Sequence, residues 1–142
     1  MRSANGSIAS FDGPGAVNTY ANYINSAGVI AGHYIDVNVV SHGYVRAADG
    51  AITRVDAPGA GTGSGQGTNA ACLNAAGILT GYFEDWNSVY HGFVRETDGV
   101  ITAFRAPRGE LGTFPRSINK GGTIAGDYRD ASGVSHGFLR IP

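Results

Sequence analysis

Short hydrophobic runs follow one another along the whole chain, and each run is bounded by glycine, asparagine or aspartate. In residues 29–35 and 78–84, for example, hydrophobic side chains are interrupted only by glycine and single polar residues. The longest stretch without glycine or proline has 12 residues, from Ala16 to Ala27. Because glycine and proline are poor helix formers, this pattern predicts short β-strands joined by tight turns, with no room for long helices.

An internal repeat organises these runs. Residues 19–28, 68–77 and 113–122 align almost without gaps, and each segment continues through an apolar pair, a glycine and an aromatic residue to an aspartate. A His-Gly-aromatic motif follows in every copy, and the three histidines are 49 and 45 residues apart: His42, His91 and His136. Such a period is typical of repeat architectures in which each unit is one small supersecondary element.

Each unit is predicted to contain four antiparallel strands, which makes twelve in all. The dipeptides Asp49-Gly50 and Asp98-Gly99 stand between the third and fourth strands, and they favour the type I′ turn of a two-residue hairpin. The aspartates at 36, 85 and 130 stand between the second and third strands. There we expect the carboxylate to bond its own backbone as an Asx turn.

The two ends of the chain complement each other. Residues 2–11 match residues 46–55 and 95–104, so they correspond to a fourth strand without its first three. The chain ends on a third strand, up to Arg140, without its fourth. We therefore expect a single domain, 1–142, of three repeats (approximately 2–45, 46–94 and 95–140), whose N-terminal strand closes the last blade of a ring.

The order Ile-Asn-x-x-Gly, Gly-x-Tyr/Phe, His-Gly-Phe and a strand ending Asp-x-Pro-Gly-Ala resembles the bacterial HAF-type extracellular repeats. The resemblance covers essentially the whole chain. It implies a β-propeller fold and an extracellular or periplasmic location, but no chemistry. The third unit departs from the pattern, because Arg105 and Arg108 stand where the other units have aspartate and glycine.

The predicted fold is therefore an all-β β-propeller of four-stranded blades, three per chain. Propellers typically have four to eight blades, so we expect a homodimer to complete a six-bladed ring. The alternative is a β-trefoil, which also uses three four-stranded units in a chain of about this length.

Composition excludes several classes of function. Ten basic and eleven acidic residues give a net charge of −1, so we expect neither nucleic acid nor a membrane as partner. The first 13 residues have no apolar segment of the kind found in signal peptides. Cys72 is the single cysteine, which excludes an intrachain disulfide.

The repeated histidines are expected to be structural, because on the third strands of a propeller they cannot converge on one metal ion. Ser41 and His42 are adjacent on a strand and point to opposite faces, so they cannot form a nucleophile and base pair. We expect no catalytic residue, no metal and no cofactor.

Candidate ligand-binding residues lie where the repeat breaks, in the loop from fourth to first strand and in the first strand itself. Guanidinium groups beside aromatic rings suit a carboxylate, a sulfate or an acidic sugar. An exposed indole could also stack on a sugar. The candidates are Arg105, Arg108, Phe114, Arg116, Tyr20, Asn22, Asn69 and Trp86, with His33, Tyr82 and Asp127 as secondary contributors.

These residues favour a non-catalytic binding module for a small polar ligand, most plausibly a carbohydrate or an anion. One alternative is a small cofactor-independent lyase, isomerase or hydrolase acting on an anionic substrate. Arg116 and Arg108 would then hold the substrate, and His33 or Asp127 would be the base. Another alternative is a structural fragment of a longer repeat array.

Overall fold

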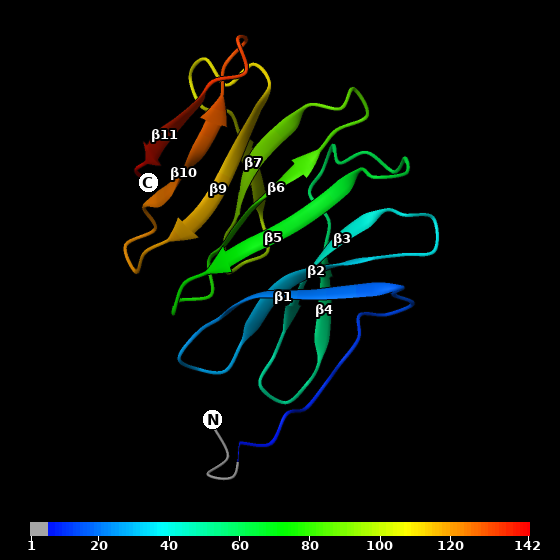
Figure 1. The fold of residues 1–142 in the computed structure, drawn as a ribbon. Helices are drawn as coiled ribbons and strands as arrows, with labels where there is room; N and C mark the ends of the chain where they lie inside the picture. Colours follow the sequence, from blue (N-terminus) through cyan, green and yellow to red (C-terminus); the bar gives the residue numbers. More distant parts are fainter. Residues whose placement is uncertain (1–5) are drawn as a thin grey trace.

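The computed structural model describes residues 6–142, which contain strands and turns but no helix (Figure 1). No helix is therefore present among these residues that could span a membrane. The strands are β1 (Asn18–Ile24), β2 (Ile30–Ile35), β3 (Ser41–Arg46), β4 (Ile52–Val55), β5 (Gly67–Leu73), β6 (Leu79–Glu84), β7 (Tyr90–Arg95), β8 (Ile101–Phe104), β9 (Gly112–Ile118), β10 (Ile124–Arg129) and β11 (Ser135–Arg140).

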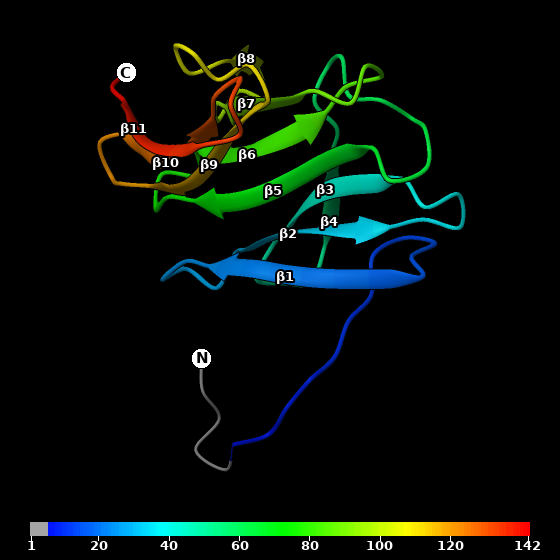
Figure 2. The same cartoon turned by 45° about the horizontal axis from the view of Figure 1, so that its top comes forward.

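The strands form three antiparallel meanders, which we call unit 1 (β1–β4), unit 2 (β5–β8) and unit 3 (β9–β11). A single parallel bridge between Ser41 and Gly67 joins units 1 and 2 into one sheet, whereas unit 3 is a separate sheet. The first strands β1, β5 and β9 lie next to one another in both views (Figures 1 and 2). Neither sheet closes into a barrel within residues 6–142, and a β-trefoil needs one, so the trefoil alternative is wrong.

The first strand of every unit carries a β-bulge, which explains a glycine of the repeat. The register of β5 against β6 shifts between Ala70 and Cys72, and β1 and β9 shift at the equivalent place. The bulge brings the carbonyl oxygen of Asn69 within 2.1 Å of where a Cβ would stand on Gly81. Since nothing larger than hydrogen fits there, the second strand needs glycine at this position.

The turn between third and fourth strands is not the predicted type I′. That type requires a positive φ at both central residues. Gly50 has a φ of 98°, but Asp49 is not among the residues with positive φ. The amide of Gly50 donates to the carbonyl of Ala47, and the amide of Ala47 donates to Ala51. This is a three-residue turn that ends in a glycine bulge.

The turn between second and third strands confirms the predicted role of its aspartate. One carboxylate oxygen of Asp85 accepts the backbone amides of Asn87 and Val89, at 2.8 and 3.0 Å. The other oxygen lies 2.8 Å from Nε2 of His91, whose ring stacks on Phe83. Units 1 and 3 repeat this arrangement, with the pairs Asp36–His42 and Asp130–His136. Each of the three histidines is thus bonded to the turn aspartate of its own unit.

The hydrophobic core lies between units. At the first boundary, Ala31 and Val55 of unit 1 pack in one cluster with Leu73, Leu79 and Phe93 of unit 2. At the second boundary, side chains of unit 2 pack with side chains of unit 3: Val94, Phe104, Ile118, Ile124 and Phe138. Each unit therefore buries its hydrophobic face only against a neighbour, as in other repeat proteins.

The expected twelfth strand is not formed within the described residues. Residues 1–5 of the predicted segment 2–11 lie outside them, and residues 6–11 belong to no strand. Residues 6–11 lie beside unit 1, at the opposite end of the molecule from β11 (Figure 1). Among residues 6–142, no fourth strand lies beside the edge of β11.

Candidate functional site

Three aromatic rings gather where the first strand of unit 3 meets unit 2. The ring of Phe114 lies 5.3 Å from that of Tyr82 and 5.1 Å from that of Tyr90, and the two tyrosine rings are 6.1 Å apart. All three side chains are half-buried, so part of each ring faces solvent. Burial is the largest cause that raises the pKa of Tyr90, and the nearby Glu84 carboxylate raises it further. The hydroxyl of Tyr90 therefore stays neutral.

An ion pair completes this group. Nε of Arg116 lies 2.7 Å from Oδ1 of Asp127, and the guanidinium stands over the rings of Phe114 and Tyr82, at 5.4 and 5.9 Å. The hydrogen bond to Asp127 raises the pKa of Arg116, so the guanidinium stays charged. We call Tyr82, Tyr90, Phe114, Arg116 and Asp127 the rim cluster.

The bulge of β9 accounts for this geometry. Pro115 pairs with Gly126 and Ser117 pairs with Ala125, which leaves Arg116 as the unpaired bulge residue. A bulge redirects the side chain of its extra residue. Arg116 thereby reaches back across the strand pair to Asp127 instead of extending freely into solvent.

Unit 1 uses the equivalent positions differently. The ring of Tyr20 stacks on His33 at 4.7 Å, and the bulge residue Asn22 contacts Nδ1 of His33 at 3.2 Å. The Asn22 amide also donates to the carbonyl of Ala70 in unit 2, at 2.8 Å. Burial lowers the pKa of His33. Tyr20 and Asn22 thus form a second group with His33, separate from the rim cluster. The side-chain oxygen of Asn69 lies 3.3 Å from Oγ of Ser41, also between units 1 and 2.

Three other candidates take no part in either group. The Nε of Arg105 donates to the carbonyl of Gly109, which fixes the loop between β8 and β9. Arg108 is exposed in the same loop, with a φ of 68°. Trp86 is 81% exposed in the turn between β6 and β7 and shares no ring contact with another residue of 6–142. Arg105 thus bonds within its own loop, whereas Arg116 bonds to Asp127.

Sequence reasoning missed Tyr90 as a site residue. Its signal was present, because Ser41 and Ser135 occupy the same position before the histidine in the other units. A large aromatic that replaces serine in one of three copies marks a break in the repeat. Tyr82 and Asp127, named only as secondary contributors, are central members of the cluster.

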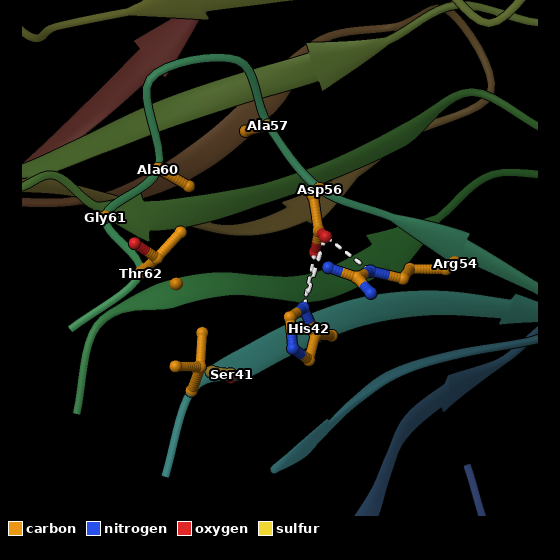
Figure 3. Close-up of a pocket in the computed structure, with 10 residues that line it drawn as sticks. Ser41, His42, Arg54, Asp56, Ala57, Ala60, Gly61 and Thr62 are labelled. Atoms are coloured by element: carbon orange, nitrogen blue, oxygen red, sulfur yellow. Dashed lines mark hydrogen bonds and ion pairs between the residues drawn. The ribbon is translucent and has the colours of Figure 1, made fainter. Parts of the chain in front are cut away.

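A polar hollow around His42 also brings ionisable groups together. Figure 3 shows the carboxylate of Asp56 between the His42 ring and the Arg54 guanidinium. Nδ1 of His42 lies 3.1 Å from Asp56, and Nε2 lies 3.4 Å from Asp36. The hydroxyl of Ser41 points away from His42 and donates to the carbonyl of Thr68. The hollow measures about 70 Å³, which is room for a few water molecules.

Within residues 6–142, the hollow included, no three histidine, cysteine, aspartate or glutamate side chains are placed so that they could hold a metal ion. The rim cluster itself contains no nucleophile of the serine or cysteine type, and its carboxylate is already paired with Arg116. The rim cluster presents partly exposed aromatic rings beside one hydrogen-bond donor, Arg116, and one acceptor, Asp127, which hold each other in place.

Comparison with known proteins adds no relative to this picture: no family model matches the chain, and neither a curated protein nor a solved structure is significantly similar to it.

Proposed function

We propose that this protein is a non-catalytic binding module for a small polar ligand and that the rim cluster is its binding surface. The observation that carries the proposal is the position of Arg116, held by Asp127 over the rings of Phe114 and Tyr82. Rings that are partly exposed beside oriented polar groups are the combination that recognises the face and the hydroxyls of a sugar.

The ion pair favours a carbohydrate over a free anion. The charge of Arg116 is balanced by Asp127 at 2.7 Å, so the cluster offers no net positive charge. Paired in this way, the guanidinium still has N–H groups to donate and the carboxylate still has lone pairs to accept hydrogen bonds from hydroxyls. An acidic sugar would bring a negative charge, and the cluster has no unpaired positive charge to balance it.

We further propose that the three units are blades of a β-propeller, as the likeness to HAF-type repeats implies, and that two chains make the complete ring. An extracellular or periplasmic location rests on that likeness alone. The adjacent first strands β1, β5 and β9 support the arrangement, because in a propeller the first strands line the centre.

A glycan array followed by titration calorimetry tests the proposed function. We expect a sugar ligand whose dissociation constant rises at least about tenfold in Tyr82→Ala, because one aromatic stacking contact contributes about 1.5 kcal/mol. Trp86→Ala is the matched control, since it removes a more exposed aromatic outside the cluster and should leave binding unchanged. Well-folded protein that binds nothing on the array refutes the proposal, and so does binding that Tyr82→Ala leaves intact.

A further inference from the structure

The first strand of unit 1 lacks a neighbour that the other first strands have. Ile24 of β1 is 58% exposed, whereas the equivalent Leu73 and Ile118 are 2% and 7% exposed. In β5 and β9 these side chains are covered by the preceding unit, through the two core clusters. Within residues 6–142 no unit packs on this side of β1, and the same hydrophobic surface is open.

The last strand shows the complementary deficit. Leu139 of β11 is 72% exposed, whereas the equivalent Val94 of β7 is 3% exposed. A Cβ built on Gly43 or Gly92 would meet atoms of the fourth strand and of the following unit at less than 3.5 Å. On the equivalent Gly137 it would meet nothing closer than 4.0 Å. Within the described part of the chain, neither a fourth strand nor a following unit covers this side of unit 3.

The segment before β1 is already docked as the end of a fourth strand. Phe11 packs edge-on against Tyr44 at 6.1 Å and lies under the guanidinium of Arg46 at 4.7 Å. Phe104, at the end of β8, contacts Phe138 and Arg140 of unit 3 in the same way, at 6.0 and 5.1 Å.

The hydrogen bond that follows this segment is the same one that follows the fourth strands β4 and β8. The amide of Gly13 donates to the hydroxyl of Thr19, as Ala57 does to Thr68 and as Ala106 does to Thr113. Ile8, the counterpart of Ile52 and Ile101, is nevertheless 97% exposed. A hollow of about 730 Å³ lies between this segment and the hairpin of β1 and β2.

An asparagine ladder runs through the units in one direction and is open at both ends. The side-chain amide of Asn25 donates to the carbonyl of Asn74 at 3.5 Å, and that of Asn74 donates to the carbonyl of Asn119 at 3.1 Å. The side-chain amide of Asn119 meets no acceptor within residues 6–142. The next acceptor in the series would be the carbonyl of an Asn25.

We propose that unit 3 of one copy binds unit 1 of a second copy head to tail, and that residues 8–11 of the second copy pair with β11 as its missing fourth strand. The register follows from the pairs Gly43–Val55 and Val45–Thr53 in unit 1 and their counterparts in unit 2. It places Phe11 opposite Gly137, Ala9 opposite Leu139 and Ile8 opposite Arg140, with the two strands antiparallel.

One copy cannot supply this strand to itself, so the occupant we propose is a second copy. The segment 8–11 and β11 lie at opposite ends of one molecule (Figures 1 and 2), so a chain cannot close on itself. Two copies joined twice in this way contain six units, within the usual range of four to eight blades. The inference rests on the propeller arrangement proposed above but not on the ligand.

Cross-linking tests the register. Copies carrying Ala9→Cys are mixed with copies carrying Leu139→Cys in mild denaturant, refolded together under reducing conditions, and oxidised only once the chains are folded. We expect a disulfide-linked pair in the mixture, because directly opposed residues of antiparallel strands bring their Cβ atoms to about 5 Å. A mixture of Ala9→Cys with Val37→Cys is the control and should stay unlinked. The native Cys72 is buried and does not interfere.

Light scattering tests the stoichiometry, with an expected mass of twice 14.6 kDa. Leu139→Asp should raise the dissociation constant of the dimer at least about 100-fold, because it would bury an unpaired charge. Val37→Asp, at a similarly exposed turn residue, should leave it unchanged. Circular dichroism of the dilute variants confirms that each chain is folded.

Each alternative result has a definite meaning. A monomer, a mass of three or more copies, or a dimer without the Ala9–Leu139 cross-link overturns the inference. A cross-linked dimer that binds no glycan refutes the proposed function and leaves the assembly standing, whereas a monomer that binds sugar through Tyr82 does the reverse.

Discussion

Nε2 of His91 lies 2.8 Å from Oδ2 of Asp85, while the other oxygen of that carboxylate holds the two amides that shape the turn between β6 and β7. Asp85 thus links the turn between β6 and β7 to a side chain of β7. Burial raises the pKa of Asp85, but the hydrogen bonds from Val89, His91 and Asn87 outweigh it, and the pKa falls below the usual 3.8. The repetition of this contact in every unit indicates that the histidine serves the fold and not a reaction.

The lowered pKa predicts acid sensitivity of the fold. A carboxyl whose pKa is depressed in the folded state stabilises the protein above its unfolded pKa, and this stabilisation is lost as the pH falls through the folded pKa. Asp36 and Asp130 also have lowered pKa values, so three sites act together. We expect the free energy of unfolding, measured in urea, to fall steeply below about pH 4.

Replacing one of these carboxyls isolates its contribution. Asp85→Asn keeps an oxygen for the turn amides but loses the charge beside His91, and should cost about 1 kcal/mol at pH 7 and much less at pH 3. Asp98→Asn is the matched control, because Asp98 accepts an amide in an exposed turn without a histidine partner. Equal losses at both pH values for Asp85→Asn would contradict the assignment.

The bulge of β5 predicts that Gly81 tolerates no side chain. A Cβ there would stand 2.1 Å from the carbonyl oxygen of Asn69, in a backbone that has no flexible group to move away. Gly81→Ala should therefore lower the free energy of unfolding by at least about 2 kcal/mol. Gly121→Ala adds the same group at an exposed turn where units 1 and 2 already have alanine, and it should change stability by less than about 0.5 kcal/mol.

The sequence was sufficient to predict the three meanders and the role of the turn aspartates, because these depend on local patterns that occur three times. The details of the candidate site depend on longer-range geometry. The pairing of Arg116 with Asp127 depends on Arg116 being the unpaired residue of the bulge in β9. The spacing of residues along the sequence does not show which residue of the strand is unpaired. The type I′ prediction failed for a related reason, since Asp49-Gly50 also fits a turn in which only the glycine has positive φ.

Burial predicts that the single thiol is inert in the folded protein. Cys72 is 3% exposed, and burial raises the pKa of its thiol. Because the thiolate is the reactive form, a thiol reagent should label native protein far more slowly than protein unfolded in urea. Leu73→Ala, which opens the core beside it at a cost of about 2–4 kcal/mol, should accelerate labelling. Rapid labelling of the stable native chain would refute the burial of Cys72.

Comparison of the units also identifies a residue under backbone strain. Val39 has a φ of 63° in the turn between β2 and β3, and the equivalent residue of unit 3 is Gly133, with a φ of 82°. A branched side chain is costly in this left-handed region, by about 1–2 kcal/mol, whereas glycine adopts it freely. The turn needs this conformation, because the amide of Val39 donates to the carbonyl of Asp36 and the chain must then continue into β3.

Val39→Gly should therefore raise the free energy of unfolding by about 1 kcal/mol, measured in urea at neutral pH. Val37→Gly, two residues earlier in the same exposed turn, has no strain to relieve and should be neutral or destabilising, because glycine gains more freedom in the unfolded chain. The two valines are both at least half exposed, so loss of hydrophobic contact is small for either variant and the difference between them reports the backbone alone. Equal effects of the two substitutions would show that the turn stores no strain at Val39.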